Sequence, residues 1–283
     1  MKKIRLLSFT ITLLLITLPL LLSGQDKDLR KIKWERKAVA PGLIWLSAQT
    51  AVNDSLPQNI NVLIADISRR EVEIEYSSRK NTIVSQQASS SGALAAVNAG
   101  FFNMQSNGSV TYIRVDGEIT DPDTAQIWNK KLNMTGSVLV DTAGNVYIMR
   151  AMGNWWYDSH QEFEDVLVTG PLLLLDKKKV LLPATSLASD RHPRTAIGTD
   201  RKGRVYLITV DGRAKEARGM TLPELTGLMR ALKIRDGVNL DGGGSTTMWI
   251  SGKPFSGVVN MPSDNRKFDH EGERPVASII IIR

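Results

Sequence analysis

The feature that most restricts the fold is a series of short apolar runs, each ended by turn residues. Glu71–Tyr76 alternates between polar and apolar residues, which is typical of a strand with one buried face. Ala93–Val97 and Val276–Ile282 are almost entirely apolar, which predicts strands buried on both faces. We therefore expect a fold built mainly from short strands.

Other runs and the turns between them complete this pattern. Strands are expected at Asn61–Ile67, Ser137–Val140, Asn145–Met149, Leu172–Leu175, Val180–Leu182, Arg204–Val210 and Val238–Leu240. Asp141–Gly144 and Asp176–Lys179 then predict turns between neighbouring strands. One helix is clear, because Thr221–Glu224 fits a capping box and apolar residues recur at helical spacing to near Ile234. The predicted class is α+β: a single domain with a mixed, hairpin-rich β-sheet core and few helices.

Residues 1–24 are typical of an export signal. Three basic residues precede a largely apolar run at Leu6–Leu22, and the small residues Ser23 and Gly24 follow. A leucine occupies the third position before either cleavage point, so an uncleaved membrane anchor stays open as an alternative. We expect an exported protein, periplasmic or secreted, with a polar linker at 25–36 and the folded domain at 37–283.

The composition excludes several classes of protein. The chain has no cysteine, which excludes disulfides, thiolate catalysis and lipid attachment to a cysteine, so a hydrophobic core must hold the fold. Its net charge is +7, and setting aside the three basic residues of the signal leaves +4. The basic runs do not alternate with aromatic residues, so we expect no nucleic-acid partner.

The strongest candidate site is the segment Asn239–Thr246. A short strand leads to Asp241, and Gly242, Gly243, Gly244, Ser245 and Thr246 follow it. Three consecutive glycines indicate special backbone angles or close approach of a ligand. Their amides, with the two hydroxyls, could bind an anion. Asp241 could be a base, a nucleophile or a metal ligand; the alternative is a tight turn in which it only caps the backbone.

Further candidates lie at other predicted strand ends. Arg194 begins the run R-T-A-I-G and could bind phosphate through its guanidinium, or be one of a surface arginine pair. Asp211 and Arg213 belong to a D-G-R segment after a strand, where working groups are often presented, although an ordinary β-turn has the same residues. Asn98 ends the buried strand at Ala93–Val97 and must bond to a substrate or to neighbouring backbone.

A last pair of candidates, Glu273 and Arg274, directly precedes the C-terminal strand. The carboxylate could act in catalysis and the guanidinium in substrate binding. An exposed salt bridge between the two side chains is the alternative.

Taken in order, six segments resemble the phosphodiester glycosidase family. They are N-A-G-F-F (98–102), T-G-P-L (169–172), R-T-A-I-G (194–198), D-G-R (211–213), N-L-D-G-G-G-S-T (239–246) and R-P-V-A (274–277). The likeness extends from about Ala93 to the C-terminus. It implies an exported hydrolase that cleaves a sugar from a sugar-1-phosphodiester or a related cell-envelope or exopolysaccharide glycan.

Such a reaction expels a phosphate monoester, which is a good leaving group, so a pair of matched carboxylates is not required. We expect Asp241 to be the general base or nucleophile, with Glu273 or Asp211 as the next choices. Arg194 and the Gly242–Ser245 amides would bind the phosphate. Asn98, Arg213, Thr246 and Arg274 would contact the sugar or its phosphate.

No cofactor is required by the sequence, but a divalent cation held by Asp211, Asp241 and Glu273 stays open because carboxylate oxygens suit such ions. The expected partner is a sugar-phosphate or glycan, with membrane contact only through the N-terminal segment. The alternative function is a non-catalytic envelope glycan-binding or exopolysaccharide assembly protein, which Asp241 pointing away from a sugar pocket would favour.

Overall fold

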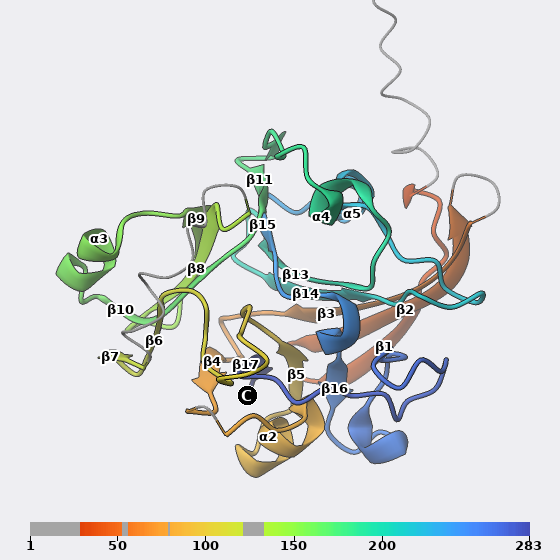
Figure 1. The fold of residues 1–283 in the computed structure, drawn as a ribbon, viewed down its shortest axis with the longest axis horizontal. Helices are drawn as coiled ribbons and strands as arrows, with labels where there is room; N and C mark the ends of the chain where they lie inside the picture. The colour runs from red at the N-terminus through yellow and green to blue at the C-terminus, as the bar shows by residue number, and fades with distance from the viewer. Residues whose placement is uncertain (1–28, 53–55, 79, 121–132) are drawn as a thin grey trace, which may run out of the picture.

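A computed structural model describes residues 29–52, 56–78, 80–120 and 133–283. The expected export signal at 1–24 lies outside these residues. Within them the chain forms three antiparallel sheets and four α-helices (Figure 1). No helix in the described ranges is long and apolar enough to cross a membrane.

The three sheets differ in size. The eight-stranded sheet has the order β1 (Glu35–Ala40), β2 (Leu43–Val52), β3 (Leu56–Ala65), β14 (Val205–Val210), β13 (Arg194–Thr199), β15 (Asp236–Asn239), β11 (Leu172–Leu175), β12 (Lys178–Lys179). The five-stranded sheet has the order β7 (Glu118–Ile119), β6 (Ile113–Val115), β10 (Phe163–Thr169), β8 (Gly136–Asp141), β9 (Val146–Arg150). The four-stranded sheet has the order β16 (Met248–Ile250), β5 (Ala95–Asn98), β17 (Ser278–Ile282), β4 (Val72–Tyr76).

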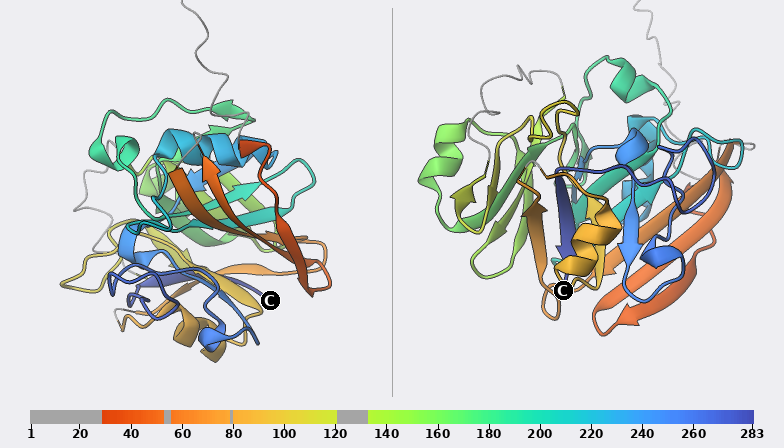
Figure 2. Two further views of the ribbon diagram at one scale, coloured as in Figure 1. Left: turned by 90° about the vertical axis from the view of Figure 1, so that its right-hand side faces the viewer. Right: turned by 60° about the horizontal axis from the view of Figure 1, so that its bottom comes forward.

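The helices are short and lie on the outer faces of the sheets. They are α2 (Val84–Ser90), α3 (Asn154–Ser159), α4 (Ser186–Ser189) and α5 (Leu222–Ala231), with 3₁₀ turns η2 (Gly243–Ser245) and η3 (Phe255–Gly257). In Figure 1, α4 and α5 lie above β13 and β14, whereas α2 lies at the opposite end beside β5 and β17. Figure 2 shows the C-terminal strand between the five-stranded sheet and the β2–β3 hairpin.

The core follows this layering. Leu225 and Met229 of α5 are buried against Ile208 on one face of the eight-stranded sheet. The opposite face packs on both smaller sheets, with Val238 and Ile280 in one continuous cluster. Burial of apolar side chains on both faces accounts for the apolar strands seen in the sequence.

The predicted α+β class is confirmed, as are its main elements. The predicted helix is α5, and it begins with the expected capping box. The Thr221 hydroxyl accepts a hydrogen bond from the Glu224 amide, and the Glu224 carboxylate accepts one from the Thr221 amide. The strand β17 lies between β5 and β4, so the C-terminal strand is central as predicted. The hairpin expected around Asp141–Gly144 is formed by β8 and β9.

Two expectations near the edges of the eight-stranded sheet are wrong. The strand predicted at Val180–Leu182 lies instead at Lys178–Lys179, because Asp176 and Lys177 both have positive φ and make a two-residue hairpin turn. The linker predicted at 25–36 ends earlier: Leu29 and Ile32 are buried against the core, and β1 begins at Glu35.

Candidate active site

Several strand ends meet at the glycine-rich segment. The strand β15 leads to Asp241, its antiparallel neighbour β13 begins at Arg194, and β14 ends beside the start of β13. Pro193 lies between two of the turns: a Cβ atom added to Gly212 would be 2.8 Å from the Pro193 nitrogen, and one added to Gly242 would be 2.7 Å from its carbonyl oxygen. Only glycine permits this approach, which brings the D-G-R and D-G-G-G turns to opposite sides of one residue.

The other two glycines let arginines approach the segment. Gly243 has a φ of +62°, and a Cβ atom there would lie 2.9 Å from Nη2 of Arg213. A Cβ atom on Gly244 would collide with the guanidinium of Arg274. Gly243 and Gly244 therefore allow two guanidinium groups from distant parts of the chain to lie against the same loop. This close approach, rather than chain flexibility, explains the run.

The Asn98 side chain is hydrogen-bonded to both ends of the glycine-rich segment. Its Nδ2 donates to the carbonyl oxygen of Asp241 at 2.6 Å, and its Oδ1 accepts from the Thr195 hydroxyl at 2.7 Å and the Thr247 amide at 3.1 Å. The Asp241 amide in turn donates to the carbonyl oxygen of Ala99 at 2.9 Å. Asn98 is fully buried, so these contacts assign it to positioning the loop.

Asp241 remains partly exposed at the centre of the site. Burial among protein atoms raises the pKa of its carboxyl to about 6, against the opposing effects of the Ser245 hydroxyl, Arg274, the Gly242 amide and Arg213. The Gly242 amide donates to Oδ1 at 3.0 Å. A carboxylate with a pKa of about 6 is largely ionised at neutral pH and basic enough to accept a proton.

The two arginines differ in their partners. Arg274 forms an ion pair with Asp264, whose Oδ1 also accepts from Nε at 2.9 Å. Arg213 is exposed and makes no hydrogen bond or ion pair with any residue in the described part of the chain. A guanidinium without a carboxylate partner, beside a second one, can accept an anionic group such as a phosphate.

The loop amides are mostly engaged within the protein. The Gly243 amide donates to Pro193, and the amides of Ser245 and Thr246 donate to Gly242 and Gly243. Most amides of the predicted anion-binding loop therefore already donate to carbonyl oxygens of the protein and are not free to bind an anion. The side-chain hydroxyls of Ser245, Thr246 and Thr247 are buried and lack a partner in strict hydrogen-bond geometry among the described residues.

Arg194 lies outside this group. It is buried, and it donates at 2.8 Å to the carbonyl oxygens of Met220, Leu187 and Asp190. Burial lowers the pKa of the Arg194 guanidinium to about 10. These contacts join the start of β13 to the segments around α4 and α5, which is a structural role.

Asp211 is also buried and fully engaged. Its carboxylate accepts from Asn59 Nδ2 at 2.7 Å, Asn260 Nδ2 at 2.8 Å and the Met261 amide at 2.9 Å. Burial raises the pKa of the Asp211 carboxyl to about 7. Asp211 connects β3, the D-G-R turn and the loop after β16. It therefore holds the turn that carries Arg213 in place.

Glu273 turns away from the loop toward α2. Its carboxylate accepts from the Ser85 amide at 2.9 Å and the Ser85 hydroxyl at 2.5 Å, at the first turn of that helix. Burial raises its pKa. No group of three or more acidic or histidine side chains in the described ranges could hold a metal ion, so Asp211, Asp241 and Glu273 do not converge as ligands.

Sequence reasoning missed the residues that support the site. Asp264 pairs with Arg274, and Asn260 joins Asp211 to the Thr246 carbonyl oxygen at 3.0 Å. Asn239, which belongs to the predicted segment, bonds through Nδ2 to Gly170 and so connects the T-G-P-L segment to the site. Asp264 and Asn260 are isolated polar residues in loops, and no local pattern distinguishes them.

A carboxylate with a raised pKa and two arginines near it, at glycine-rich strand ends, is an arrangement suited to an anionic ligand. The chain belongs to the phosphodiester glycosidase family, whose model matches residues 91–283. This match includes Asp241, Arg213 and Arg274.

Relatives agree with that assignment. N-acetylglucosamine-1-phosphodiester alpha-N-acetylglucosaminidase of Bos taurus is 27% identical over 210 residues, covering 66% of this chain and 36% of the bovine protein. The Homo sapiens enzyme of that name is 40% identical over 72 residues, covering 25% of this chain and 13% of the human protein. The chain therefore spans little more than a third of the bovine relative's length.

Solved structures show the same fold. The zebrafish catalytic domain of N-acetylglucosamine-1-phosphodiester alpha-N-acetylglucosaminidase, auto-inhibited by its pro-peptide, has a TM-score of 0.68 and 18% identity, covering 92% of this chain and 94% of that one. A hypothetical protein from Synechocystis has a TM-score of 0.66 and 14% identity, covering 88% and 63%. At such identities the likeness concerns the fold.

Proposed function

We propose that this protein is an exported glycosidase that hydrolyses a sugar-1-phosphodiester, with Asp241 as the acid–base or nucleophilic carboxylate. The observation that carries the proposal is that Arg213 and Arg274 both lie near Asp241, on the loop that matches the family. The N-terminal pattern at 1–24 supports action outside the cytoplasm. The names of the relatives support N-acetylglucosamine 1-phosphodiesters as the first substrate class to test.

In the proposed reaction, water attacks the anomeric carbon and the bond from that carbon to the phosphate oxygen breaks. The products are a free sugar and a phosphate monoester. Asp241 accepts the proton of the attacking water, or forms a glycosyl ester that water then cleaves. Arg213 and Arg274 bind the phosphate and stabilise the negative charge that develops on the leaving oxygen.

Asp211, Glu273, Asn98 and Arg194 act at a distance in this proposal. Each is engaged by hydrogen bonds within the protein, and Asp211, Asn98 and Arg194 support segments that meet at the site. We therefore assign phosphate binding to Arg213 and Arg274. The Thr246 hydroxyl, which has no hydrogen-bond partner among the described residues, is proposed to contact the substrate, whereas the Ser245 hydroxyl acts on Asp241.

The proposal is tested by incubating the purified protein with a panel of sugar-1-phosphate methyl esters and measuring released reducing sugar. N-acetylglucosamine 1-phosphate methyl ester is the first member, and the matching methyl glycoside without phosphate is the control. We expect release from at least one phosphodiester and none from the glycoside. Parallel assays with EDTA test for a divalent cation. Binding of phosphodiesters without release of sugar would favour a glycan-binding protein instead.

A further inference from the structure

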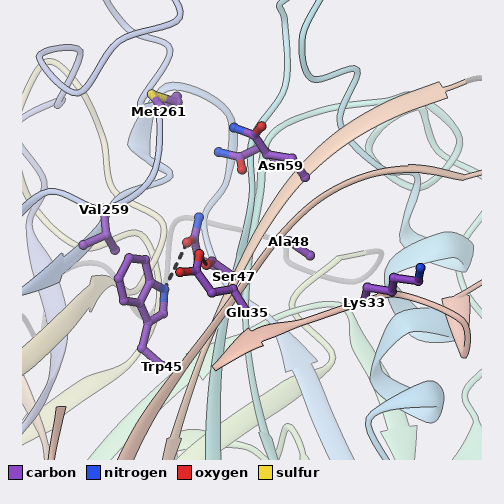
Figure 3. Close-up of a pocket in the computed structure, with 10 residues that line it drawn as sticks. Lys33, Glu35, Trp45, Ser47, Ala48, Asn59, Val259 and Met261 are labelled. Carbon is purple, nitrogen blue, oxygen red and sulfur yellow. Dashed lines mark hydrogen bonds between the residues drawn. The ribbon is translucent and has the colours of Figure 1, made fainter. Parts of the chain in front are cut away.

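A cavity outside the candidate active site lies between the β1–β3 strands and the loop after β16. Its volume is about 430 Å³, within the range of small-ligand pockets. Figure 3 shows Glu35, Ser47 and Asn59 between Trp45 on one side and Lys33 on the other. The walls are thus mostly polar, with one indole ring.

One wall residue has an unused donor. The Trp45 Nε1 donates to Asn61 Oδ1 at 3.0 Å, which leaves Asn61 Nδ2 without a partner among the described residues. Asn61 is only 2% exposed. A buried amide hydrogen without an acceptor is costly, so a ligand or water that accepts from it is favoured. Asn61 Nδ2 is therefore a candidate donor to an oxygen atom of a ligand or a water molecule.

The charge around the cavity is positive. Lys37 pairs with Glu35 at 2.8 Å, and its Nζ lies 5.2 Å from the centre of the Trp45 ring. The Nζ of Lys253 lies 5.6 Å from the same ring. Lys253 and Lys33 form no ion pair with a carboxylate in the described part of the chain. These two cations favour an anionic ligand.

The cavity is linked to the active site through Asp211. Asn59 and Met261 line the cavity, and both donate to the Asp211 carboxylate. Asp211 is two residues before Arg213, and the loop that contains Met261 continues to Asp264, the partner of Arg274.

We propose that this cavity is a subsite for an acidic sugar unit of the glycan substrate. A sugar presents several hydroxyl oxygens to Asn61, Ser47 and Glu35, and its negative group is bound by Lys253 beside the Trp45 ring. The inference rests on the proposed function for the identity of the substrate, but the binding itself requires no turnover.

The test uses the full chain labelled with 5-fluorotryptophan and followed by fluorine NMR, with the Trp45 signal assigned from Trp45→Phe. Glucose 6-phosphate is the probe because it has no anomeric phosphodiester; glucose and inorganic phosphate are the comparisons. We expect a saturable shift of the Trp45 signal with glucose 6-phosphate, and a Kd at least fivefold higher in Lys253→Ala. Lys202→Ala, in the exposed turn between β13 and β14, is the matched control and keeps the original Kd.

Binding at this cavity must persist in Asp241→Asn and Arg274→Ala, which alter only the active site. A Trp45 signal that does not move, that moves equally with glucose or phosphate alone, or that stops responding in Arg274→Ala would overturn the inference. Binding retained by a protein that releases no sugar would instead count against the proposed function alone.

Discussion

The side-chain Nδ2 of Asn98 donates to the backbone carbonyl oxygen of Asp241 at 2.6 Å. Asn98 is the last residue of β5 in the four-stranded sheet, whereas Asp241 follows β15 in the eight-stranded sheet. This bond therefore joins two packed sheets at the point where the candidate catalytic carboxylate is placed. Because the same amide also accepts from Thr195 and Thr247, one side chain aligns both ends of the glycine loop.

Replacing this amide tests its positioning role. Asn98→Ala leaves buried groups of Asp241, Thr195 and Thr247 without their partner, and we expect a loss of about 2–4 kcal/mol in the free energy of unfolding. Urea unfolding followed by circular dichroism measures the change. Gln86→Ala, at an exposed position of α2, is the control. Equal stability of the two variants would refute the role given to Asn98.

The stability of the protein should depend on pH through Asp211. Its pKa rises from 3.8 to about 7 on burial, so the native state retains a proton that the unfolded chain releases between these values. Stability contributed by this proton is present at pH 4 and lost as the pH rises to 7, by roughly 2–4 kcal/mol. Asp211→Asn does not titrate and should show a smaller fall in urea titrations at pH 5 and pH 8. Identical pH dependence in both proteins would contradict the shift.

Much of the fold could be predicted because it depends on local patterns. The capping box at Thr221 marks the start of a helix. The alternation at Glu71–Tyr76 and the apolar C-terminal segment indicate which strand faces are buried. The β1 strand, Glu35–Ala40, was not predicted, since it is an edge strand with mostly exposed residues and no apolar alternation. Sheet membership depends on pairing between distant segments, which local patterns do not encode.

Two arginines in the motif set should respond differently to truncation. Arg194→Ala removes a buried guanidinium that bonds three carbonyl oxygens, and we expect it to lower stability by about 3 kcal/mol or more. Arg213→Ala changes an exposed side chain, so stability should stay within about 0.5 kcal/mol. The KM of Arg213→Ala for a sugar-1-phosphodiester should instead rise about 10- to 100-fold. The reverse pattern in thermal melts and kinetics would restore Arg194 as the phosphate ligand.

Arg274 should set the pH at which the enzyme becomes active. If Asp241 acts as a base, kcat/KM falls as the pH drops below its pKa of about 6. Arg274 holds that pKa down, so in Arg274→Ala the acidic limb of the pH profile should move to higher pH. Arg274→Lys keeps the charge and should move the limb less. An unchanged limb in both variants would mean that another group titrates.

The site was predicted in part, for physical reasons. Asp241 and the glycines could be identified because three consecutive glycines have a strong conformational meaning. The roles of Arg194, Asp211 and Glu273 could not be separated from that of Arg213, because all are charged residues near strand ends. Only the packing shows which charges are used by the protein: carbonyl oxygens surround Arg194, and amides surround Asp211 and Glu273.

The most direct measurement of the central claim is sugar release from a sugar-1-phosphodiester by Asp241→Asn. The substitution keeps the size of the side chain but removes its charge and basicity. We expect kcat/KM to fall by about 10²- to 10⁴-fold with little loss of stability, while Asp116→Asn in the exposed turn between β6 and β7 retains full activity. Activity of Asp241→Asn within a few-fold of the unaltered protein would show that this carboxylate is not the catalytic group.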